Sequence, residues 1–448
     1  MPTDLLDIFT GLADTSDILT GDLSQYSVDG VAPRIAIAPR DVVGVSGVLR
    51  AASASGLAVA PVGGGTKLFL GNRPKRLDVV LGLRRLDCLL EHAPGDLTVT
   101  AQAGVTIEKL QSEVARHGQL LPLDVPLPSH TTLGGALAVN LTGPRRLAYG
   151  TARDVVIGIR VVDAKGEATK AGGRVVKNVT GYDLCKLYVG SLGTLAVIVE
   201  ASLRLAPMPL EERTAVGIFP SIQDACDAAL DVMRLGPRAM TMVDARAGSK
   251  LAGLASPPVG QQAALMVELT GRPAAVTRRQ SDIQATFLGR NAVSVQVLEK
   301  QESRRLWPAV TDLGWDSQRS PQQLTVRFGV LPSRVAELCR AVQEASPQPG
   351  VSLGLVAHVG HGVVRATWWP ANGGPALDTK AMALLVAELR RRATPLGSYA
   401  IVERCPAAAK EGLDVWGEGV EGLDLMRRIK EQYDPQGTLN PGRFVGGI

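Results

Sequence analysis

Three clusters of glycine and small polar residues have the composition of an anion-binding site. Residues 63–67 read Gly-Gly-Gly-Thr-Lys at the end of an apolar run, and similar turns follow at residues 131–135 and 190–194. Glycine has no Cβ, so the backbone N–H groups of such turns can approach a ligand and form a nest for an anion. Tight turns between strands are the alternative for any one cluster. Three clusters in one segment, with the positive charge of Lys67, predict a long bound anion such as the pyrophosphate of a dinucleotide.

Two histidines and two arginines toward the end of the chain could also do chemistry. His358 and His361 stand three residues apart, and on a strand or turn this spacing does not guarantee a common face. A metal pair and two packed or partly exposed histidines are both open, and the sequence favours packed histidines. Arg365 and Arg404 could clamp a carboxylate, because guanidinium groups pair with carboxylates through parallel hydrogen bonds. Surface salt bridges are the alternative for these arginines, and the sequence slightly favours them.

The hydrophobic pattern predicts two kinds of domain. The first part is typical of an α+β domain with a mixed sheet, because short strands follow one another with few helices between them. Its strands are expected at residues 34–38, 57–61, 77–81, 97–101, 155–162 and 194–205, and its helices at 41–55 and 106–117. After Pro207 and Pro209, strand–helix–strand units recur and predict a second open sheet with helices on one face. These units span residues 216–244, 264–298 and 324–369, and a last helix is expected at 423–433.

Composition excludes several classes of protein. The chain has 448 residues, which indicates at least two domains, and 45% hydrophobic with 20% charged residues is ordinary for a globular protein. Aromatic residues make up only 4%, and a net charge of +5 comes without a basic tract, so nucleic acid is not expected as a partner. We expect no signal peptide and no transmembrane segment. Five scattered cysteines without a CxxC predict a reducing cytoplasm and no iron–sulfur or zinc framework within this chain.

The stretch at residues 62–209 resembles the FAD-binding domain of the vanillyl-alcohol-oxidase-like, PCMH-type flavoproteins. The resemblance is carried by residues 61–67, 103–105, 122–124, 132–135 with 138 and 140, 149–150 and 190–194, and by the ending at 433–442. It implies an α+β fold, with a two-part PCMH-type FAD-binding domain and a cap domain whose open antiparallel sheet is covered by helices. The expected domains are an N-terminal extension at 1–33, the FAD-binding domain at 34–209, the cap at 210–415 and a returning C-terminal segment at 416–448.

The resemblance also implies which residues hold the cofactor. The glycine loop would hold the pyrophosphate, the turn at 132–135 would approach the ribityl and isoalloxazine portion, Gly193 and Thr194 would line the other wall, and Asn440 would return from the C-terminus. The full expected set is Val62, Gly63, Gly64, Gly65, Thr66, Lys67, Asp124, Thr132, Gly134, Gly135, Asn140, Gly193, Thr194 and Asn440. Members with covalent flavin often carry histidine in the glycine loop. None is near it here, so we expect non-covalent FAD.

Residues 172–184 narrow the resemblance to the glycolate oxidase group, although Lys177, Tyr182 and Asp183 could equally be solvated loop residues. Relatives that oxidise 2-hydroxy acids carry His-x-Gly-Asp-Gly-Asn and a later Glu-His pair. In them a divalent ion polarises the hydroxyl group and a neutral histidine takes its proton. Here the first motif reads His-Val-Gly-His-Gly-Val at residues 358–363, and Arg404 replaces the later histidine. Arginine cannot ligate a metal, so no metal site is expected.

These departures resemble the FAD-binding accessory subunit of glycolate oxidase, and so does Asp-Val-Trp-Gly at residues 414–417. The resemblance implies a complex with a catalytic flavoprotein and an iron–sulfur subunit, acting on a small 2-hydroxy acid such as glycolate or lactate. The location would be cytoplasmic, with any contact to the inner membrane made through partners. One alternative is a self-sufficient FAD-linked 2-hydroxyacid dehydrogenase whose changed site uses His358, His361 and Arg404. Another is a flavin-binding assembly scaffold without a redox role.

Overall fold

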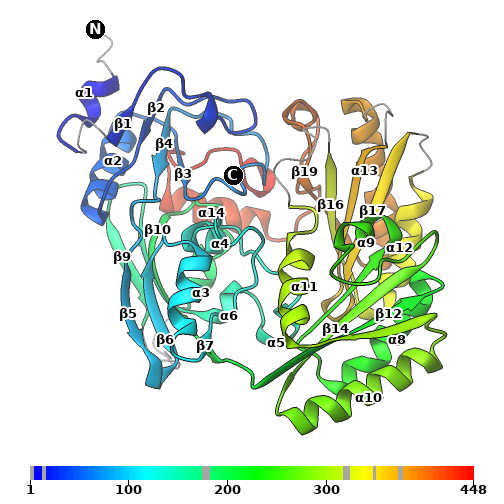
Figure 1. The fold of residues 1–448 in the computed structure, drawn as a ribbon. Helices are drawn as coiled ribbons and strands as arrows, with labels where there is room; N and C mark the ends of the chain where they lie inside the picture. Colours follow the sequence, from blue (N-terminus) through cyan, green and yellow to red (C-terminus); the bar gives the residue numbers. More distant parts are fainter. Residues whose placement is uncertain (1–4, 13–16, 174–181, 316–322, 347–349, 372–376) are drawn as a thin grey trace. The chain divides into compact units, whose positions relative to one another are not determined.

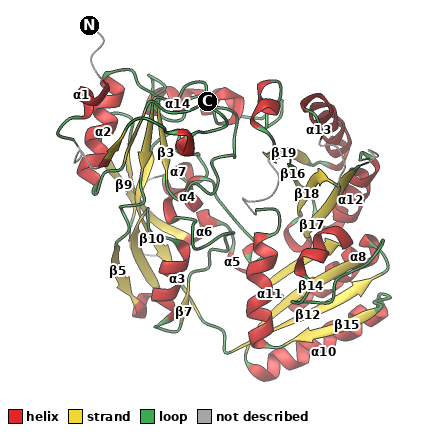
Figure 2. Cartoon of the chain, turned by 45° about the horizontal axis from the view of Figure 1, so that its top comes forward, coloured by secondary structure: helices red, strands yellow, loops and turns green. Residues whose placement is uncertain are grey.

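The computed structural model describes residues 5–12, 17–173, 182–315, 323–346, 350–371 and 377–448. The chain forms two compact units (Figures 1 and 2). Unit 1 consists of Met1–Leu141, Thr151–Met208 and Trp416–Ile448, and unit 2 consists of Thr142–Gly150 and Pro209–Val415. The segment Thr142–Gly150 lies inside the first domain by sequence, yet its contacts place it in unit 2.

A four-stranded sheet forms the first layer of unit 1, with the order β1-β2-β4-β3. The central pairs are parallel, and β1 joins the edge in the antiparallel direction. The strands are β1 (Ile18–Leu19), β2 (Ile35–Ile37), β3 (Val59–Val62) and β4 (Val79–Gly82). Helix α2 (Val42–Ala54) begins where the Asp41 carboxylate accepts the N–H of Gly44. Its apolar face packs on β2 and β4 in one buried cluster with Phe9 of α1 (Leu5–Phe9).

A five-stranded antiparallel sheet forms the second layer of unit 1, with the order β5-β6-β10-β8-β9. Its strands are β5 (Leu89–Ala93), β6 (Thr98–Gln102), β8 (Val156–Val162), β9 (Ala168–Gly172) and β10 (Val197–Arg204). Two short strands of the same unit, β7 (Gln119–Leu120) and β11 (Ala206–Pro207), form a separate antiparallel pair. The helices of this part are α3 (Ile107–Ala115), α4 (Leu133–Ala138), α6 (Ala152–Val155) and α7 (Cys185–Tyr188).

The C-terminal segment returns to the first sheet of unit 1. Helix α14 (Leu423–Tyr433) precedes an extended stretch that runs parallel to β3, because Val59 donates its N–H to the carbonyl of Thr438 and accepts one from Asn440. The ammonium of Lys430 is held beneath this stretch by the Asp434 carboxylate at 2.6 Å and by backbone carbonyls. This return brings residues from the last turn of the chain to the end of β3, where the glycine loop begins.

Unit 2 is built on an eight-stranded sheet with the order β15-β12-β14-β13-β17-β18-β16-β19, in which every pair is antiparallel. Its strands are β12 (Glu211–Phe219), β13 (Ala239–Asp244), β14 (Ala263–Gly271), β15 (Ser294–Leu298), β16 (Leu324–Gly329), β17 (Val351–His358), β18 (Val363–Pro370) and β19 (Tyr399–Arg404). The helices are α5 (Arg146–Tyr149), α8 (Ile222–Val232), α9 (Ala245–Gly248), α10 (Pro273–Gly289), α11 (Lys300–Asp312), α12 (Val335–Glu344) and α13 (Thr379–Ala393).

Helices cover both faces of this sheet, whereas the sequence predicted them on one face. Gly217 of β12 packs against Phe287 of α10, while its neighbour Val216 shares a buried cluster with Trp307 of α11. Neighbouring residues of a strand point to opposite faces, so α10 and α11 lie on opposite sides. The amphipathic pattern of residues 300–312, with Leu306, Trp307 and Val310 buried, is the local signal in the sequence that predicts α11.

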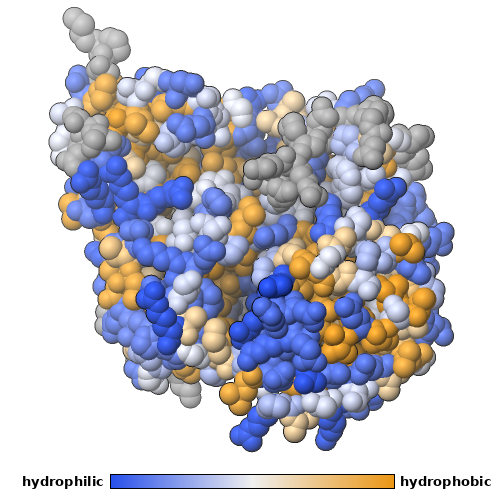
Figure 3. Space-filling view, in the orientation of Figure 1, coloured by the Kyte–Doolittle hydropathy of each residue, from blue (hydrophilic) through white to orange (hydrophobic). Residues whose placement is uncertain are grey.

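Hydrophilic side chains cover much of the surface seen in Figure 3, with apolar side chains between them. Among the described helices, none is both long and apolar enough to cross a membrane.

Asp244 gives unit 2 a predictable dependence on pH. Its carboxylate caps α9 by accepting the N–H of Ala247 at 2.8 Å, and burial raises its pKa to about 6. The folded state therefore binds the proton more tightly than the unfolded chain, and this part of the stability is present at low pH and lost as pH rises through 6. We expect Asp244→Asn, which keeps a capping oxygen, to remove a loss of about 3 kcal/mol between pH 4 and pH 7.

Thermal unfolding followed over this pH range measures the effect. Asp41→Asn is the matched control, because Asp41 caps α2 from an exposed position. Parallel pH profiles for the wild-type chain and Asp244→Asn would contradict the assignment.

Candidate functional site

The glycine loop after β3 has backbone packing that excludes any larger residue. A Cβ on Gly64 would lie 1.7 Å from the backbone oxygen of His130, and one on Gly63 would lie 2.1 Å from Oγ1 of Thr132. Gly65 has a φ of +73°, in the left-handed region that favours glycine. The loop is therefore fitted closely to the turn that precedes α4, and glycine is required for the approach.

The turn before α4 forms the facing wall. Thr132 caps α4 with its Oγ1, which accepts the N–H of Gly135, and Gly134 packs so closely on Ala103 that an added Cβ would lie 2.7 Å from the alanine Cβ. The hydroxyl oxygens of Thr66 and Thr131 are 3.2 Å apart, which ties the glycine loop to this turn.

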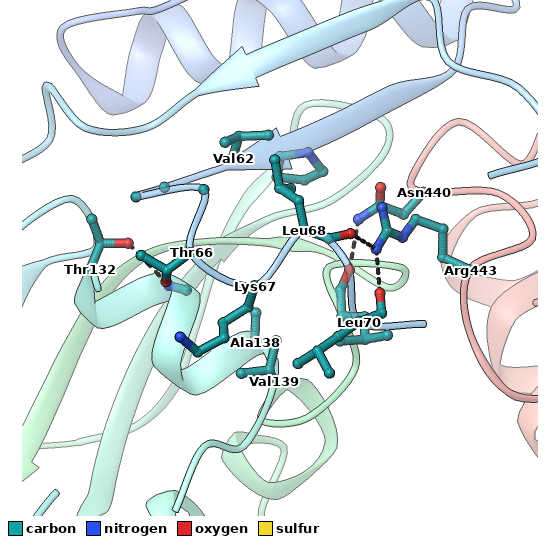
Figure 4. Close-up of a pocket in the computed structure, with 16 residues that line it drawn as sticks. Val62, Thr66, Lys67, Leu68, Leu70, Thr132, Ala138, Val139, Asn440 and Arg443 are labelled. Carbon is teal, nitrogen blue, oxygen red and sulfur yellow. Dashed lines mark hydrogen bonds between the residues drawn. The ribbon is translucent and has the colours of Figure 1, made fainter. Parts of the chain in front are cut away.

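The C-terminal return closes the third side, as Figure 4 shows. Asn440 donates from Nδ2 to the carbonyl of Leu192 at 2.7 Å. Arg443 donates from Nη2 to the carbonyls of Leu68 and Leu70, so it holds the chain that follows the glycine loop. Burial lowers the pKa of Arg443. One pocket results, lined by Pro61, Val62, Gly63, Gly64, Gly65, Thr66, Lys67, Leu68, Leu70, Thr132, Gly135, Ala138, Val139, Leu192, Asn440 and Arg443.

Unit 2 contains a second polar site, on one face of its sheet. Arg365 of β18 stands opposite Arg327 of β16 and opposite Val356 of β17. His358 is two residues beyond Val356, so it shares the face of Arg365. On β19, Arg404 pairs with Thr325 and Val402 with Val326, which leaves Glu403 as the extra residue of a bulge. Four strands thus bring His358, Arg365, Arg327 and Glu403 into one row.

The row is held together by short polar contacts. The Glu403 carboxylate accepts a hydrogen bond from Arg365 Nε at 2.8 Å and forms an ion pair with Arg327, whose Nε is 2.9 Å away. His358 lies between Thr241 Oγ1, 2.9 Å from its Nδ1, and Arg365 Nη1, 3.4 Å from its Nε2. The guanidinium of Arg365 also stacks over the ring of Trp315, with 5.2 Å to the ring centroid.

Both histidines of the site are neutral near pH 7. Burial lowers the pKa of His358 well below its ordinary value, helped by His361 and two arginines. Burial also lowers the pKa of His361 to about 3, with Arg146 and Arg365 adding to the shift. Within the described parts of the chain, neither ring nitrogen of His361 has a well-formed hydrogen bond, although the backbone of Gly143 opposes the shift. The two imidazole centroids are 5.3 Å apart.

A buried ion network holds Arg146 beside this site. Its neighbour Arg145 makes two hydrogen bonds to Glu268, of 3.1 and 3.0 Å, and Arg238 makes two more, of 2.8 and 2.6 Å. Glu268 is fully buried in β14. The network therefore fixes the segment Thr142–Gly150 to the sheet of unit 2.

Two family profiles match the chain: "FAD binding domain" over residues 33–172, and "FAD linked oxidases, C-terminal domain" over residues 208–394 and 416–444. D-lactate dehydrogenase of Archaeoglobus fulgidus is 31% identical, over 93% of this chain and 93% of the relative. The chain belongs to the FAD-linked oxidase family. It is similar to glycolate oxidase subunit GlcD of Bacillus subtilis, at 29% identity over 92% of this chain and 89% of that protein.

Further comparisons agree with this FAD-linked oxidase assignment. D-2-hydroxyglutarate dehydrogenase of Xanthomonas citri is 27% identical over 94% of this chain and 92% of its own length. Among solved structures, p-cresol methylhydroxylase has a TM-score of 0.74 at 16% identity, covering 98% of this chain and 95% of that one. 4-Ethylphenol oxidase of Gulosibacter chungangensis has the same TM-score, covering 98% and 96%. The predicted PCMH-type α+β fold and the resemblance to FAD flavoproteins are confirmed, and the chain is an FAD-dependent oxidoreductase.

The unit 1 pocket of this FAD-linked oxidase suits the cofactor. The glycine backbone of residues 63–65 would receive a pyrophosphate, and a side chain on Gly63 or Gly64 would collide with the facing turn. Lys67 and Arg443 are both buried cations that line the same pocket, and positive charge there favours a phosphate.

The expected FAD residues fall into two groups in the structure. Those that line the pocket are Val62, Gly63, Gly64, Gly65, Thr66, Lys67, Thr132, Gly135 and Asn440. Asp124, Gly134, Asn140, Gly193 and Thr194 do not line it. Gly193 lies behind Asn440, and a Cβ there would be 3.5 Å from its Nδ2. Thr194 is buried and donates to the carbonyl of Ser191. The Asn140 Oδ1 is buried and has no hydrogen-bond partner among the described residues.

Sequence reasoning missed several lining residues. Leu68, Leu70, Val139 and Arg443 line the pocket, and none was in the expected set. Arg443 comes directly after the block at residues 433–442 that carried the resemblance, so a charged residue close to the predicted cofactor contact Asn440 was the available signal.

The unit 2 site does not fit a metal ion. The guanidinium of Arg365 fills the space between His358 Nε2 and the Glu403 carboxylate. Among the residues that the structure describes, no three His, Cys, Asp or Glu side chains come together as a ligand set. Arg365 is buried in an ion pair with Glu403, so it forms neither the surface salt bridge nor the open clamp that the sequence analysis considered.

The remaining expected residues are less informative. Arg404 lies half-buried at the end of β19, opposite Thr325. Tyr182 is 97% exposed. Asp183 forms an exposed ion pair with Lys186 at 3.3 Å. Lys177 lies outside the described residues.

Proposed function

We propose that this chain is the FAD-binding subunit of a glycolate-oxidase-like complex that oxidises a small 2-hydroxy acid. The observation that carries the proposal is the contrast between its two sites. The glycine loop of unit 1 has the close backbone packing that suits a pyrophosphate. In unit 2, by contrast, the guanidinium of Arg365 fills the centre of the polar site. Relatives named for glycolate, D-lactate and D-2-hydroxyglutarate share a 2-hydroxy acid, which supports this class of substrate.

The electrostatics of unit 2 support low activity of the chain alone. A general base works best when its pKa lies near the working pH, and His361, with a pKa of about 3, is a weak acceptor for a hydroxyl proton. His358 is also neutral, but its Nε2 faces the Arg365 guanidinium. The proton of a substrate hydroxyl would therefore be taken by another polypeptide, the catalytic flavoprotein subunit.

Partners would also carry the electrons away. When bound, FAD accepts a hydride equivalent and can release electrons to a second centre. The five cysteines of the chain are all free, and burial raises the pKa of Cys185 to about 11 and that of Cys226 to about 12, so these two thiols stay protonated. An iron–sulfur subunit is the acceptor that the proposal names.

The proposal is tested by purifying the native protein with and without associated proteins. We expect the isolated chain to carry dissociable FAD, which acid precipitation leaves in the supernatant, and to bleach its flavin only slowly with glycolate or D-lactate. The native complex should show a second flavin and iron–sulfur absorbance. Rapid bleaching by the isolated chain would overturn the proposal. An unchanged rate in a complex that lacks FAD in this subunit alone would favour the scaffold alternative.

One observation favours a second candidate, the self-sufficient dehydrogenase. In the described chain, Arg146 makes no side-chain hydrogen bond or ion pair, and it lies close enough to His361 to lower that group's pKa. A half-buried guanidinium beside an imidazole that makes no well-formed hydrogen bond to the described residues could receive a substrate carboxylate. His361→Ala should then abolish turnover, while His117→Ala, at an exposed position, should not. Unchanged turnover in His361→Ala would exclude this candidate.

A further inference from the structure

The guanidinium of Arg365 occupies a position with the surroundings of a bound divalent cation. On one side it contacts the imidazole of His358, with Nη1 3.4 Å from Nε2, and on the other the carboxylate of Glu403, with Nε 2.8 Å from Oε2. An imidazole nitrogen and a carboxylate oxygen are the donors that proteins use for zinc and similar ions.

Hydrogen bonding determines which His358 nitrogen faces the cation. Arginine has donors only, so Nε2 of His358 must present its lone pair to Arg365. The proton is then on Nδ1, which donates to Thr241 Oγ1 at 2.9 Å. A metal-bound histidine is held in the same way, with one nitrogen on the ion and the other N–H on an oxygen. His358 is thus oriented as a ligand, but toward an arginine.

The other charged groups at this position also disfavour a metal ion. Arg327 shares the Glu403 carboxylate from the neighbouring strand, at 2.9 Å. The imidazole of His361 has its centroid 5.3 Å from that of His358, and the positive charges of Arg146 and Arg365 lower its pKa. Among the residues that the structure describes, Glu403 is the one carboxylate paired with Arg365, and it already serves two arginines. A divalent ion added to this set would meet uncompensated positive charge.

We propose that Arg365 is a permanent internal cation that replaces a divalent metal ion in unit 2, and that it makes this site independent of metal. Position 365 is cross-strand to Val356 and shares the face of His358, so Arg365→His would supply the missing third donor. The set His358, residue 365 and Glu403 would then be the two-histidine, one-carboxylate set of many metal sites.

The experiment measures Co²⁺ binding to the purified full-length chain by visible absorption and calorimetry. The wild-type chain should show no specific Co²⁺ spectrum, and its unfolding temperature should not change with EDTA. Arg365→His should bind one Co²⁺ on the order of 100-fold more tightly than the wild-type chain, with the absorption of a protein-ligated ion. This readout does not depend on activity or partners. The metal-binding experiment can therefore fail while the proposed function stands, and the proposed function can fail while the metal-binding result stands.

Control variants separate the metal site from a general loss of fold. Arg365→Lys keeps the cation and should fold without binding Co²⁺, and adding His358→Ala to Arg365→His should abolish the binding. If Arg365→His is unstable without metal, Co²⁺ should raise its unfolding temperature, because a ligand that binds only the folded state stabilises it. Stoichiometric Co²⁺ binding by the wild-type chain that His358→Ala removes would overturn the proposal. So would a failure of Co²⁺ either to bind or to stabilise Arg365→His.

Discussion

A chain with Gly64→Ala is expected to lose roughly 10- to 100-fold in FAD affinity, and to purify largely without flavin. The added Cβ would lie 1.7 Å from the backbone oxygen of His130, and the backbone on that side cannot rotate away as a side chain would. The glycine loop and the turn before α4 must therefore separate, which moves the backbone N–H groups that would meet the pyrophosphate. Flavin absorbance per polypeptide, and titration of the apoprotein with FAD, measure the effect.

Gly95→Ala is the matched control within the same unit. It lies in the short 3₁₀ turn Pro94–Asp96, and a Cβ there would have nothing within 4 Å. We expect its FAD content and unfolding temperature to equal those of the wild-type chain. A Gly64→Ala chain that retains stoichiometric flavin would show that the cofactor is not held at this loop.

The second large effect is expected at Glu268. Replacing it with glutamine removes the countercharge that Arg145 and Arg238 share and leaves Arg238 with Glu212 alone, at 3.4 Å. Removing one partner of a buried ion pair costs about 3–5 kcal/mol in proteins. Burial alone would raise the pKa of Glu268, but Arg145 and Arg238 lower it more, so the carboxylate is charged in the folded state. Glu268→Gln should therefore unfold unit 2 at clearly lower denaturant concentration.

Tryptophan fluorescence reports this change selectively. Trp307, Trp315, Trp368 and Trp369 belong to unit 2, and Trp416 belongs to unit 1. Glu337→Gln is the control, because Glu337 pairs with Arg334 on an exposed helix surface and such pairs add little to stability. Equal unfolding midpoints for Glu268→Gln and Glu337→Gln would mean that the network contributes nothing beyond a surface pair.

Local sequence signals predicted much of unit 1. Glycine at residues 63–65 reflects a local requirement, because a backbone segment that closely approaches another cannot carry a Cβ. This requirement can be recognised from the residue types alone. Strands such as β8 and β10 were also predicted close to their observed bounds, because an apolar run bounded by turns is a local pattern. The pocket residues Leu68, Leu70 and Val139 carry no such signal, because a lone aliphatic residue reads the same in a core and in a ligand site.

The sequence by itself therefore determined the closely packed glycine loop, the PCMH-type α+β fold and the FAD cofactor, whose motifs are local or follow a familiar order. Only the tertiary structure decided what the polar residues of unit 2 do. Arg365 meets Glu403 because β16 lies between β18 and β19 and a bulge on β19 inserts one extra residue. Arg145 joins Glu268 across more than a hundred positions of sequence. Register, bulges and long-range ion pairs are set when strands assemble, so residue types alone could not show that a guanidinium fills this site.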